Sequence, residues 1–346
     1  MYNFKDDYSE GAHPNILKAL LETNLSQQMG YGEDEICKKA VYVIKEKLQR
    51  KNIDIHFVSG GTQANLIVLS SILKSYESVI SANSGHIFTH EAGAIEVTGH
   101  KVNSIQTSNG KITTKQINDV INEHKKLYEH MVKPKVVFIS QSTEIGTIYL
   151  KKELENIYNY CKKNNLLLYL DGARIGSALS SSKNDLSLSD IVDFTDIFYI
   201  GGTKNGALLG EAIIISNNDL KKDFRIHMKQ RGALLAKGRI LGIQFLELFK
   251  NNDNLFFDIA KHANNMAVKL TQGIKELHYK FFSESPTNQI FPIFPNSIIK
   301  QLQKKYGFYI WSKEDATTSA IRLVTSWATK EDKVDEFIAD LKRMEK

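Results

Sequence analysis

Hydrophobic residues along this chain fall into short continuous runs separated by amphipathic stretches. A continuous apolar run of about four to eight residues is typical of a buried strand. Such runs occupy residues 53–58, 135–139, 166–170, 196–200 and 211–215. Apolar residues at helical spacing predict helices between them, over residues 14–21, 36–48, 66–73, 114–127, 151–164 and 186–193. Alternating strands and helices of this kind indicate an α/β fold.

The pattern changes after residue 215. A long helical region is expected over residues 219–250, and short strands at 289–294, 308–311 and 320–325 alternate with helices beyond it. Strand 211–215 follows strand 196–200 after a short loop, so these two strands are expected to pair antiparallel. We therefore predict an N-terminal arm (1–14), a large α/β domain (15–250) and a small C-terminal α+β domain (251–346). The small domain would begin with a helical connection over about 251–277.

Composition excludes several classes of function. The chain has 346 residues, 42% of them hydrophobic and 24% charged, which is typical of a soluble globular protein. Its lysines give a formal net charge of +6 but form no basic stripe, so nucleic-acid binding is not expected. Cys37 and Cys161 form no CxxC motif, which argues against a disulfide framework and a metal site. No apolar run reaches membrane-spanning length, and a cytoplasmic location is expected.

The candidate chemistry starts with Lys204. It follows the apolar run 197–200 inside the glycine-rich loop GGTKNG. A lysine held there is expected to lose hydration, which lowers the pKa of its amine and makes it a nucleophile. A free amine forms a Schiff base with a carbonyl, and pyridoxal phosphate (PLP) is the common carbonyl cofactor bound in this way. The local sequence is equally compatible with an ordinary loop lysine.

Asp171 strengthens the cofactor interpretation. It ends the run 166–170, and a carboxylate against the pyridine nitrogen keeps PLP protonated there. Ligands of open α/β sheets bind outside the carboxyl ends of the strands, so successive strands would deliver Asp171 and Lys204 to one edge. Taken alone, an aspartate at this position is also typical of a helix N-cap. The pair together favours a PLP site.

The segments DGAR (171–174) and GGTKNGALLGEA (201–212) resemble the threonine aldolase and β-eliminating lyase family of PLP enzymes, and in particular its bacterial branch. The resemblance runs from NFKDDYSEGAHP near the N-terminus to IRLVTSW at 321–327. It implies the PLP-dependent transferase fold (fold type I), with a mostly parallel central sheet, helices on both faces and a small C-terminal α+β domain. The implied reaction is retro-aldol cleavage of L-threonine, L-allo-threonine and related β-hydroxy-α-amino acids to glycine and an aldehyde.

The resemblance also implies roles for individual residues. Lys204, His86 and Asp171 would be catalytic. The cofactor would contact Gly61, Thr62, His86, Asp171, Arg174, Lys204 and Arg239. The amino-acid substrate would contact Ser9, Tyr31, Arg174 and Arg322. No metal is expected. The implied assembly is a homo-oligomer, a dimer of dimers with shared active sites, in which a basic residue such as Arg239 meets a neighbouring cofactor phosphate.

Several of these positions have simpler explanations. Gly61 and Thr62 would also suit a glycine turn capped by the threonine, and Ser9 an ordinary turn. His86 alone would suit an exposed loop, Arg239 a solvated helix face, and Arg322 a structural salt bridge.

Two function classes compete with the aldolase: another PLP-dependent β-eliminating lyase, and a non-catalytic relative. The segment SQSTEIGT (140–147) lacks the histidine of the ENTHN-like segment found in many family members. Whatever that histidine does elsewhere must therefore be done differently in this chain.

Overall fold

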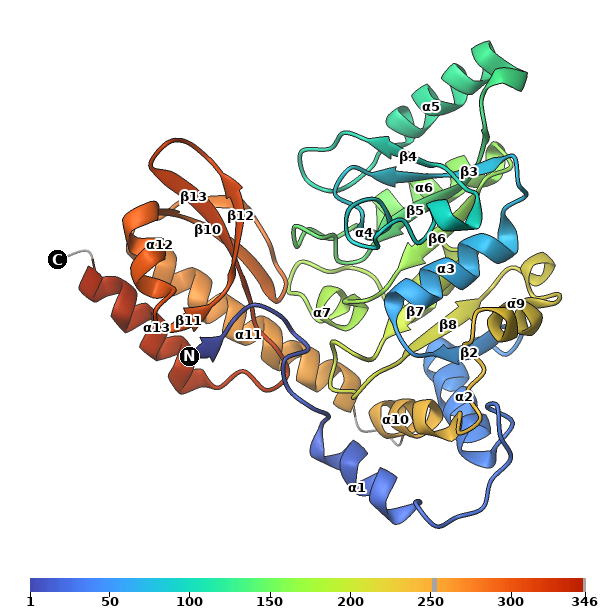
Figure 1. Ribbon diagram of the computed structural model, residues 1–346, viewed down its shortest axis with the longest axis horizontal. Coiled ribbons are helices and arrows are strands. Elements are labelled where there is room, and N and C mark those ends of the chain that lie inside the picture. The colour runs from blue at the N-terminus through green and yellow to red at the C-terminus, as the bar shows by residue number, and fades with distance from the viewer. Residues whose placement is uncertain (251–253, 345–346) are drawn as a thin grey trace.

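The computed structural model describes residues 1–250 and 254–344. Among them, the largest sheet has the strand order β2-β8-β7-β6-β5-β3-β4 and forms the centre of the larger lobe (Figure 1). Its strands are Asp54–Val58 (β2), Glu77–Ala82 (β3), Val102–Ile105 (β4), Lys133–Ser140 (β5), Leu167–Asp171 (β6), Ile197–Gly201 (β7) and Glu211–Ile215 (β8). β8 runs antiparallel to both of its neighbours, while β3 to β7 pair in parallel. The predicted mostly parallel sheet is confirmed, including the antiparallel 211–215 strand.

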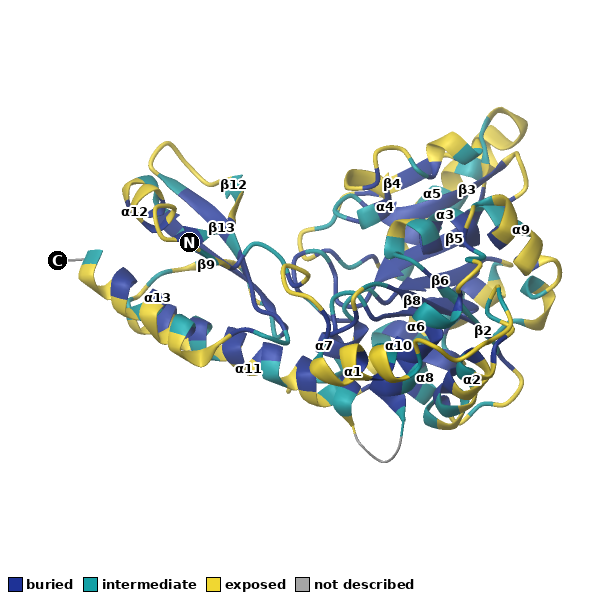
Figure 2. Cartoon of the chain, turned by 60° about the horizontal axis from the view of Figure 1, so that its bottom comes forward, coloured by how far each residue is buried: buried dark blue, intermediate teal, exposed yellow. Residues whose placement is uncertain are grey.

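Both faces of this sheet are buried, which explains why its strands are continuous apolar runs. In β5, Val136 and Phe138 pack on one face and Val137 and Ile139 on the other. Helices α3 (Gly61–Ile72) and α9 (Phe224–Gln230) cover the first face. The second face is covered by α2 (Glu35–Leu48), α5 (Thr114–Leu127), α6 (Lys151–Lys163), α8 (Leu188–Asp193) and α10 (Arg239–Phe249). Helix α1 (Pro14–Glu22) packs against α10. Figure 2 shows the strands dark with burial between these helices.

The smaller lobe contains an antiparallel sheet of order β12-β13-β10-β9. Its strands are Phe281–Ser283 (β9), Gln289–Pro295 (β10), Tyr309–Lys313 (β12) and Thr318–Val324 (β13). Helices α11 (Leu255–Glu276), α12 (Asn296–Leu302) and α13 (Glu331–Met344) pack with it around a separate hydrophobic core. The predicted small α+β domain is thus present. The exact division at 250/251 stays a prediction, because residues 251–253 lie outside the described part.

The N-terminal arm begins in the smaller lobe. Strand β1 (Tyr2–Asn3) pairs with β11 (Tyr306–Gly307), and Phe4 is fully buried in the core of that lobe. The arm then crosses to α1 in the larger lobe, as the blue trace in Figure 1 shows. Residues 5–13 therefore pass between the lobes.

The helical region expected over 219–250 is divided. It contains the 3-10 turn Asn218–Leu220 and the two helices α9 and α10, with a loop at 231–238 in which Gly232 has a φ of +70°. The remaining short elements are α4 (His86–Thr89), α7 (Ile175–Leu179) and the 3-10 turns Glu96–Thr98 and Tyr128–His130. Within the described residues, no helix has the length and apolar character that crossing a membrane requires.

Candidate active site

The ends of two neighbouring strands bring Asp171 and Lys204 together. Asp171 is the last residue of β6, and Lys204 follows the end of the parallel strand β7 by three residues. Both line a cavity of about 310 Å³ at this edge of the sheet. Gly61, Thr62 and His86 line the same cavity. The structure thus brings together these five residues from four separate segments of the chain.

The loop around Lys204 requires its glycines. A Cβ on Gly201 would lie 2.3 Å from the carbonyl oxygen of Ala173, and one on Gly202 would lie 2.8 Å from that of Gly210. This close packing of the backbone fixes the Lys204 loop at the ends of the strands. Burial, and then the Arg174 guanidinium, lower the pKa of the Lys204 amine. In the described part of the chain the amine has no hydrogen bond or ion pair, so it is available to a ligand.

Asp171 is fixed by backbone and side-chain donors. Its Oδ1 accepts from the backbone N–H of Ala173 at 2.9 Å, and its Oδ2 lies 3.4 Å from Asn65 Nδ2. Helix α7 has Arg174, not Asp171, at its N-cap position, so the helix-cap alternative does not apply. The Asp171 carboxylate instead projects into the cavity that Lys204 also lines.

His86 is oriented by a buried carboxylate. Its Nδ1 lies 2.8 Å from Glu91 Oε1, an oxygen that also accepts from Asn65 Nδ2 at 2.6 Å. The Glu91 side chain is fully buried, whereas the His86 side chain is 35% exposed. A carboxylate oxygen accepts, so the contact requires a proton on Nδ1. Glu91 is therefore the supporting partner of His86 and does not cap a helix.

The start of helix α3 forms an anion cradle. The N-cap residue is Gly60, and no side chain caps the first turn. Thr62 lies inside the helix, so the alternative of a threonine cap does not apply. Uncapped backbone N–H groups at a helix N-terminus, together with the helix dipole, favour a bound phosphate. Ser142 lines the same cavity with a buried hydroxyl that has no partner in the described structure.

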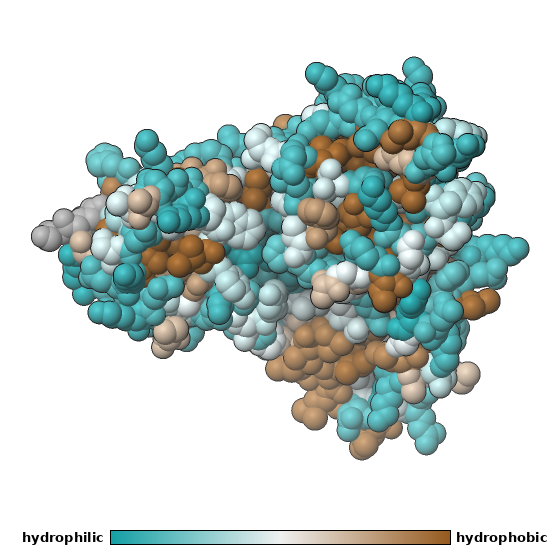
Figure 3. Space-filling model, turned by 45° about the horizontal axis from the view of Figure 1, so that its top comes forward, coloured by the Kyte–Doolittle hydropathy of each residue, from teal (hydrophilic) through white to brown (hydrophobic). Residues whose placement is uncertain are grey.

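A larger cavity of about 530 Å³ adjoins the first one. Both are lined by Tyr8, His86, Glu144, Arg174 and Lys204. The outer cavity adds side chains from the smaller lobe, namely Gln289, Tyr309, Ile310, Trp311 and Arg322, as well as His90. Figure 3 shows the recess between the two lobes. Polar groups from both lobes thus face one continuous space.

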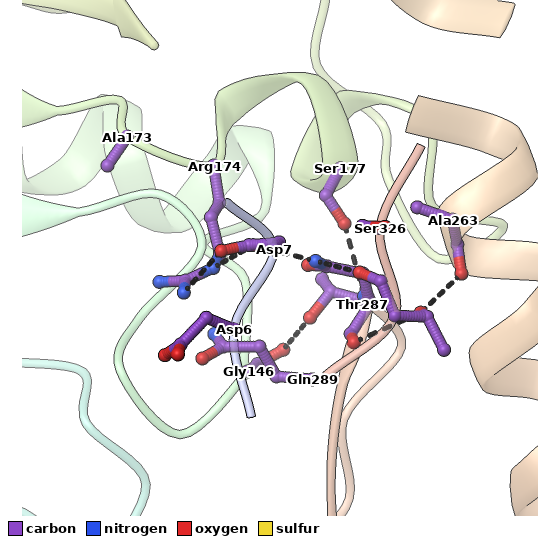
Figure 4. Close-up of polar contacts among 12 residues, drawn as sticks. Asp6, Asp7, Gly146, Ala173, Arg174, Ser177, Ala263, Thr287, Gln289 and Ser326 are labelled. Atoms are coloured by element: carbon purple, nitrogen blue, oxygen red, sulfur yellow. Dashed lines mark hydrogen bonds and ion pairs between the residues drawn. The ribbon is translucent and has the colours of Figure 1, made fainter. Parts of the chain in front are cut away.

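Arg174 forms a buried ion pair with the N-terminal arm. Its Nε and Nη2 donate to the two carboxylate oxygens of Asp7 at 2.7 and 3.1 Å, and Asn288 Nδ2 donates to Asp7 at 2.9 Å. Figure 4 shows the Asp7 carboxylate directed at Arg174. Burial acts to raise the pKa of Asp7, but the Arg174 and Lys204 charges hold it below its ordinary value. Asp7 thereby fixes the guanidinium at the cavity wall.

Arg322 is held more loosely. Its guanidinium lies over the rings of Tyr309 and Trp311, with centroids 5.2 and 5.6 Å away. Nη2 donates to the Lys5 carbonyl at 3.2 Å and lies 3.7 Å from Asp6 Oδ1, while the buried Nε has no partner in the described structure. A long salt bridge is present, as the simpler explanation supposed. The Arg322 guanidinium nevertheless has a donor that these contacts leave unoccupied.

Three predicted residues lie outside both cavities. Ser9 accepts a hydrogen bond from Asn3 on the exposed side of the arm. Tyr31 is 46% exposed, with the amine of Lys229 4.4 Å from its ring centroid. Arg239 donates to the carbonyls of Thr23, Asn24 and Ser26 after helix α1. Their roles stay predictions, and those of Tyr31 and Arg239 require a neighbouring subunit.

The sequence analysis did not identify several residues that line the site. Tyr8 and Glu144 line both cavities, and His90 lines the outer one. A signal existed for Glu144, which stands in the SQSTEIGT segment noted for its missing histidine. Asp6 and Asp7 were present in the arm motif, but their partners are more than 160 residues away.

Comparison with known proteins places this site in a family. A model of the β-eliminating lyase family matches residues 6–296. The low specificity L-threonine aldolase of Pseudomonas aeruginosa is 31% identical, over 98% of this chain and 96% of that protein. A threonine aldolase structure from Leishmania major is 48% identical, with a TM-score of 0.97 over 99% of each chain.

The fold extends further than the sequence similarity. An aspartate aminotransferase from Thermus thermophilus has a TM-score of 0.73 at 13% identity, over 99% of this chain and 91% of that one. This likeness confirms the expected transferase fold. The family resemblance drawn from DGAR and GGTKNGALLGEA is also confirmed, and the chain belongs to the β-eliminating lyase family.

Proposed function

We propose that the protein binds PLP through Lys204 and cleaves L-threonine, L-allo-threonine and related β-hydroxy-α-amino acids to glycine and an aldehyde. The observation that carries the proposal is the shared cavity of Lys204 and Asp171, which opens toward two arginines. The names of the similar proteins from Pseudomonas aeruginosa and Leishmania major support threonine as the substrate.

The residues present fit this cofactor. The uncapped start of α3 with Gly61 and Thr62 would hold the phosphate, and the partnerless Ser142 hydroxyl lies in the same cavity. The Asp171 carboxylate would hold the pyridine nitrogen protonated. The bound cofactor supplies a carbonyl for the Lys204 amine and a ring that takes up electron density from the α-carbon of the substrate.

The chain itself would bind and orient the substrate. A planar guanidinium matches a carboxylate with two parallel hydrogen bonds. Arg322 lines the outer cavity and has donors that no described group occupies, whereas Asp7 already occupies two donors of Arg174. We therefore propose that Arg322 makes the main contact with the α-carboxylate of the substrate. Arg174 adds positive charge beside Lys204 and keeps that amine unprotonated more often.

A visible spectrum of the purified protein with PLP tests the cofactor assignment. We expect absorbance near ~420 nm that disappears on borohydride reduction, because a carbonyl condensed with a protein amine absorbs there. Incubation with L-threonine should then release equimolar glycine and acetaldehyde, measured by amino-acid analysis and a coupled dehydrogenase. A protein that binds PLP but yields pyruvate and ammonia from β-substituted amino acids would instead be a β-eliminating lyase, the alternative that the matching family description favours.

We also propose a homo-oligomer, a dimer of dimers, located in the cytoplasm. Helix α1 and the segment after it expose Leu17, Leu21, Leu25 and Met29, with 49, 78, 93 and 71% of each residue accessible. Figure 3 shows hydrophobic side chains gathered at the lower end of the larger lobe. Large exposed apolar patches mark interaction sites, and a second copy would also give Tyr31 and Arg239 a cavity to reach.

The oligomer has a direct test. One chain has a mass of 39.2 kDa. Light scattering of the purified protein should report at least twice the mass of one chain, and about four times the mass of one chain for the complete dimer of dimers. Leu21→Asp and Leu25→Asp should lower the mass and the activity together, because they place charges in the interface. Lys115→Asp, exposed on helix α5 at the opposite end of the larger lobe, is the matched control. A fully active monomer would contradict the shared-site proposal.

A further inference from the structure

Glu144 is a carboxylic residue that lies where the two cavities meet. It follows strand β5 in the SQSTEIGT segment and lines both the inner and the outer cavity. Lys204 lines both as well. A substrate bound to the cofactor beside Lys204, with its carboxylate held by Arg322, would extend past Glu144. Glu144 is therefore placed beside the reacting part of the substrate.

One oxygen of Glu144 is fixed and the other is free. Oε1 accepts from the backbone N–H of His86 at 2.9 Å and from the Ser140 hydroxyl at 2.7 Å. Within the described residues, Oε2 makes no hydrogen bond. Two donors on one oxygen hold the carboxyl plane in place without occupying the second oxygen, so Oε2 can take a proton from a ligand.

Resting on the function proposed above, we propose that Glu144 is the base that accepts the β-hydroxyl proton of the substrate. The substrate O–H bond gives its proton to Oε2, and its electron pair becomes the second bond of the departing aldehyde carbonyl. The Cα–Cβ bond breaks, and its electron pair stays with the α-carbon. A proton then joins that carbon to give glycine, so the atoms and the charge balance.

The environment suits this task. Burial, and then the negative charge of Asp171, raise the pKa of Glu144, whereas the Ser140 hydroxyl opposes the rise. A carboxylate with a raised pKa is a stronger base, and catalysis is most effective when that pKa approaches the working pH. Glu144 is thus a stronger base than an ordinary glutamate, and it lines both cavities.

Two histidines compete for the same role. His86 is one of the residues predicted to be catalytic, but its Nδ1 is bound to Glu91, and stacking over a cofactor ring would direct its nitrogens sideways. His90 stacks on His86, with centroids 5.6 Å apart, but lines only the outer cavity. Burial, and then the charge of His86, lower its pKa. His86 also lines both cavities, but the stacking role expected of it assigns it to the face of the cofactor ring, whereas Glu144 keeps one oxygen free for the β-hydroxyl.

The experiment compares two reactions of the PLP-loaded protein. Glu144→Gln keeps the shape and removes the base, so we expect kcat for L-threonine cleavage to fall by about a hundredfold or more. Exchange of the glycine α-hydrogen for deuterium in D₂O, followed by NMR, involves no β-hydroxyl group. Its rate in Glu144→Gln should therefore change by less than about threefold, far less than the loss of a general base would cause. Glu123→Gln, an exposed glutamate on helix α5, is the matched control and should affect neither reaction by more than that. His90→Gln is a separate test of the competing histidine. Glu144→Asp should restore part of the cleavage rate.

A second readout uses the protein without cofactor. Carboxyl ¹³C NMR of glutamate-labelled protein should show a signal that titrates above the ordinary glutamate pKa and is absent from Glu144→Gln. Burial raises the pKa of Glu211 to about 8, so its signal should also titrate high but persist in the variant. An equal loss of cleavage and exchange in Glu144→Gln would make the residue structural and overturn the proposal. Unchanged cleavage would also overturn it, and a selective loss in His90→Gln would assign the proton to His90. If the wild-type protein performs neither reaction, the proposed function itself is wrong.

Discussion

Lys204→Ala is expected to remove the covalent link to PLP and nearly all turnover. In the described part of the chain, Lys204 places its amine in the cavity that Asp171 also lines, and no protein group occupies that amine. Its pKa is lowered, first by burial and then by Arg174, which increases the unprotonated, nucleophilic fraction of the amine. Loss of a catalytic nucleophile typically costs several powers of ten in kcat.

Peptide mapping after borohydride reduction measures this directly. The wild-type protein should yield one pyridoxyl-modified peptide, containing Lys204, and the variant should yield none. Lys163→Ala, at the exposed end of helix α6, is the control and should keep both the label and the cleavage rate. A pyridoxyl group on another lysine of the wild-type protein would show that the assignment of Lys204 is wrong.

The central part of the site could be predicted because it follows from the geometry of parallel strands. Asp171 and Lys204 each follow a continuous apolar run, and neighbouring parallel strands end at the same edge of a sheet. The same logic predicted that β8 is antiparallel, since only a short loop separates it from β7. These inferences needed only the local pattern and the direction of the chain.

Strands β3 and β4 lack that pattern. Their sequences, ESVISA and VNSI, contain serine and asparagine where apolar residues would be expected. The structure satisfies these groups across the strands, as Asn103 Nδ2 donates to Ser78 Oγ at 2.9 Å. A buried polar group is tolerated when it is paired, and the partner lies 25 residues away. Hydrophobic periodicity cannot reveal such a pair.

The contacts of the N-terminal arm could not be predicted from the sequence for a similar reason, because their partners lie far away along the chain. Asp7 meets Arg174 only because β1 pairs with β11 and draws the arm between the lobes. The local letters KDDYS show two acids but not the guanidinium that each one approaches. Tyr31 and Arg239 differ again, because the roles expected of them depend on a second copy of the chain.

Arg322→Lys is expected to separate an amino-acid enzyme from a mere PLP binder. Lys204 and Asp171 would serve any user of the cofactor, whereas Arg322 lies in the smaller lobe, at the far wall of the outer cavity. Lysine keeps the charge but loses the planar fork that binds a carboxylate with two hydrogen bonds. The loss should cost about 2–4 kcal/mol, or about thirtyfold to several-hundredfold in kcat/KM for L-threonine. The ~420 nm absorbance and the Tm should change little, because neither the cofactor's carbonyl nor the lobe core depends on this side chain.

Asp6→Asn provides the matched control for that result. It removes the acidic partner of the 3.7 Å ion pair with Arg322 but leaves the guanidinium in place. If Arg322 binds the substrate carboxylate, the asparagine variant should keep or improve kcat/KM, because Asp6 no longer competes for the charge. If Arg322 serves only as a structural salt-bridge residue, both variants should lower the Tm together and leave kcat/KM of the folded fraction unchanged. Titration of each variant with L-threonine, with the Tm measured in parallel, distinguishes the two cases.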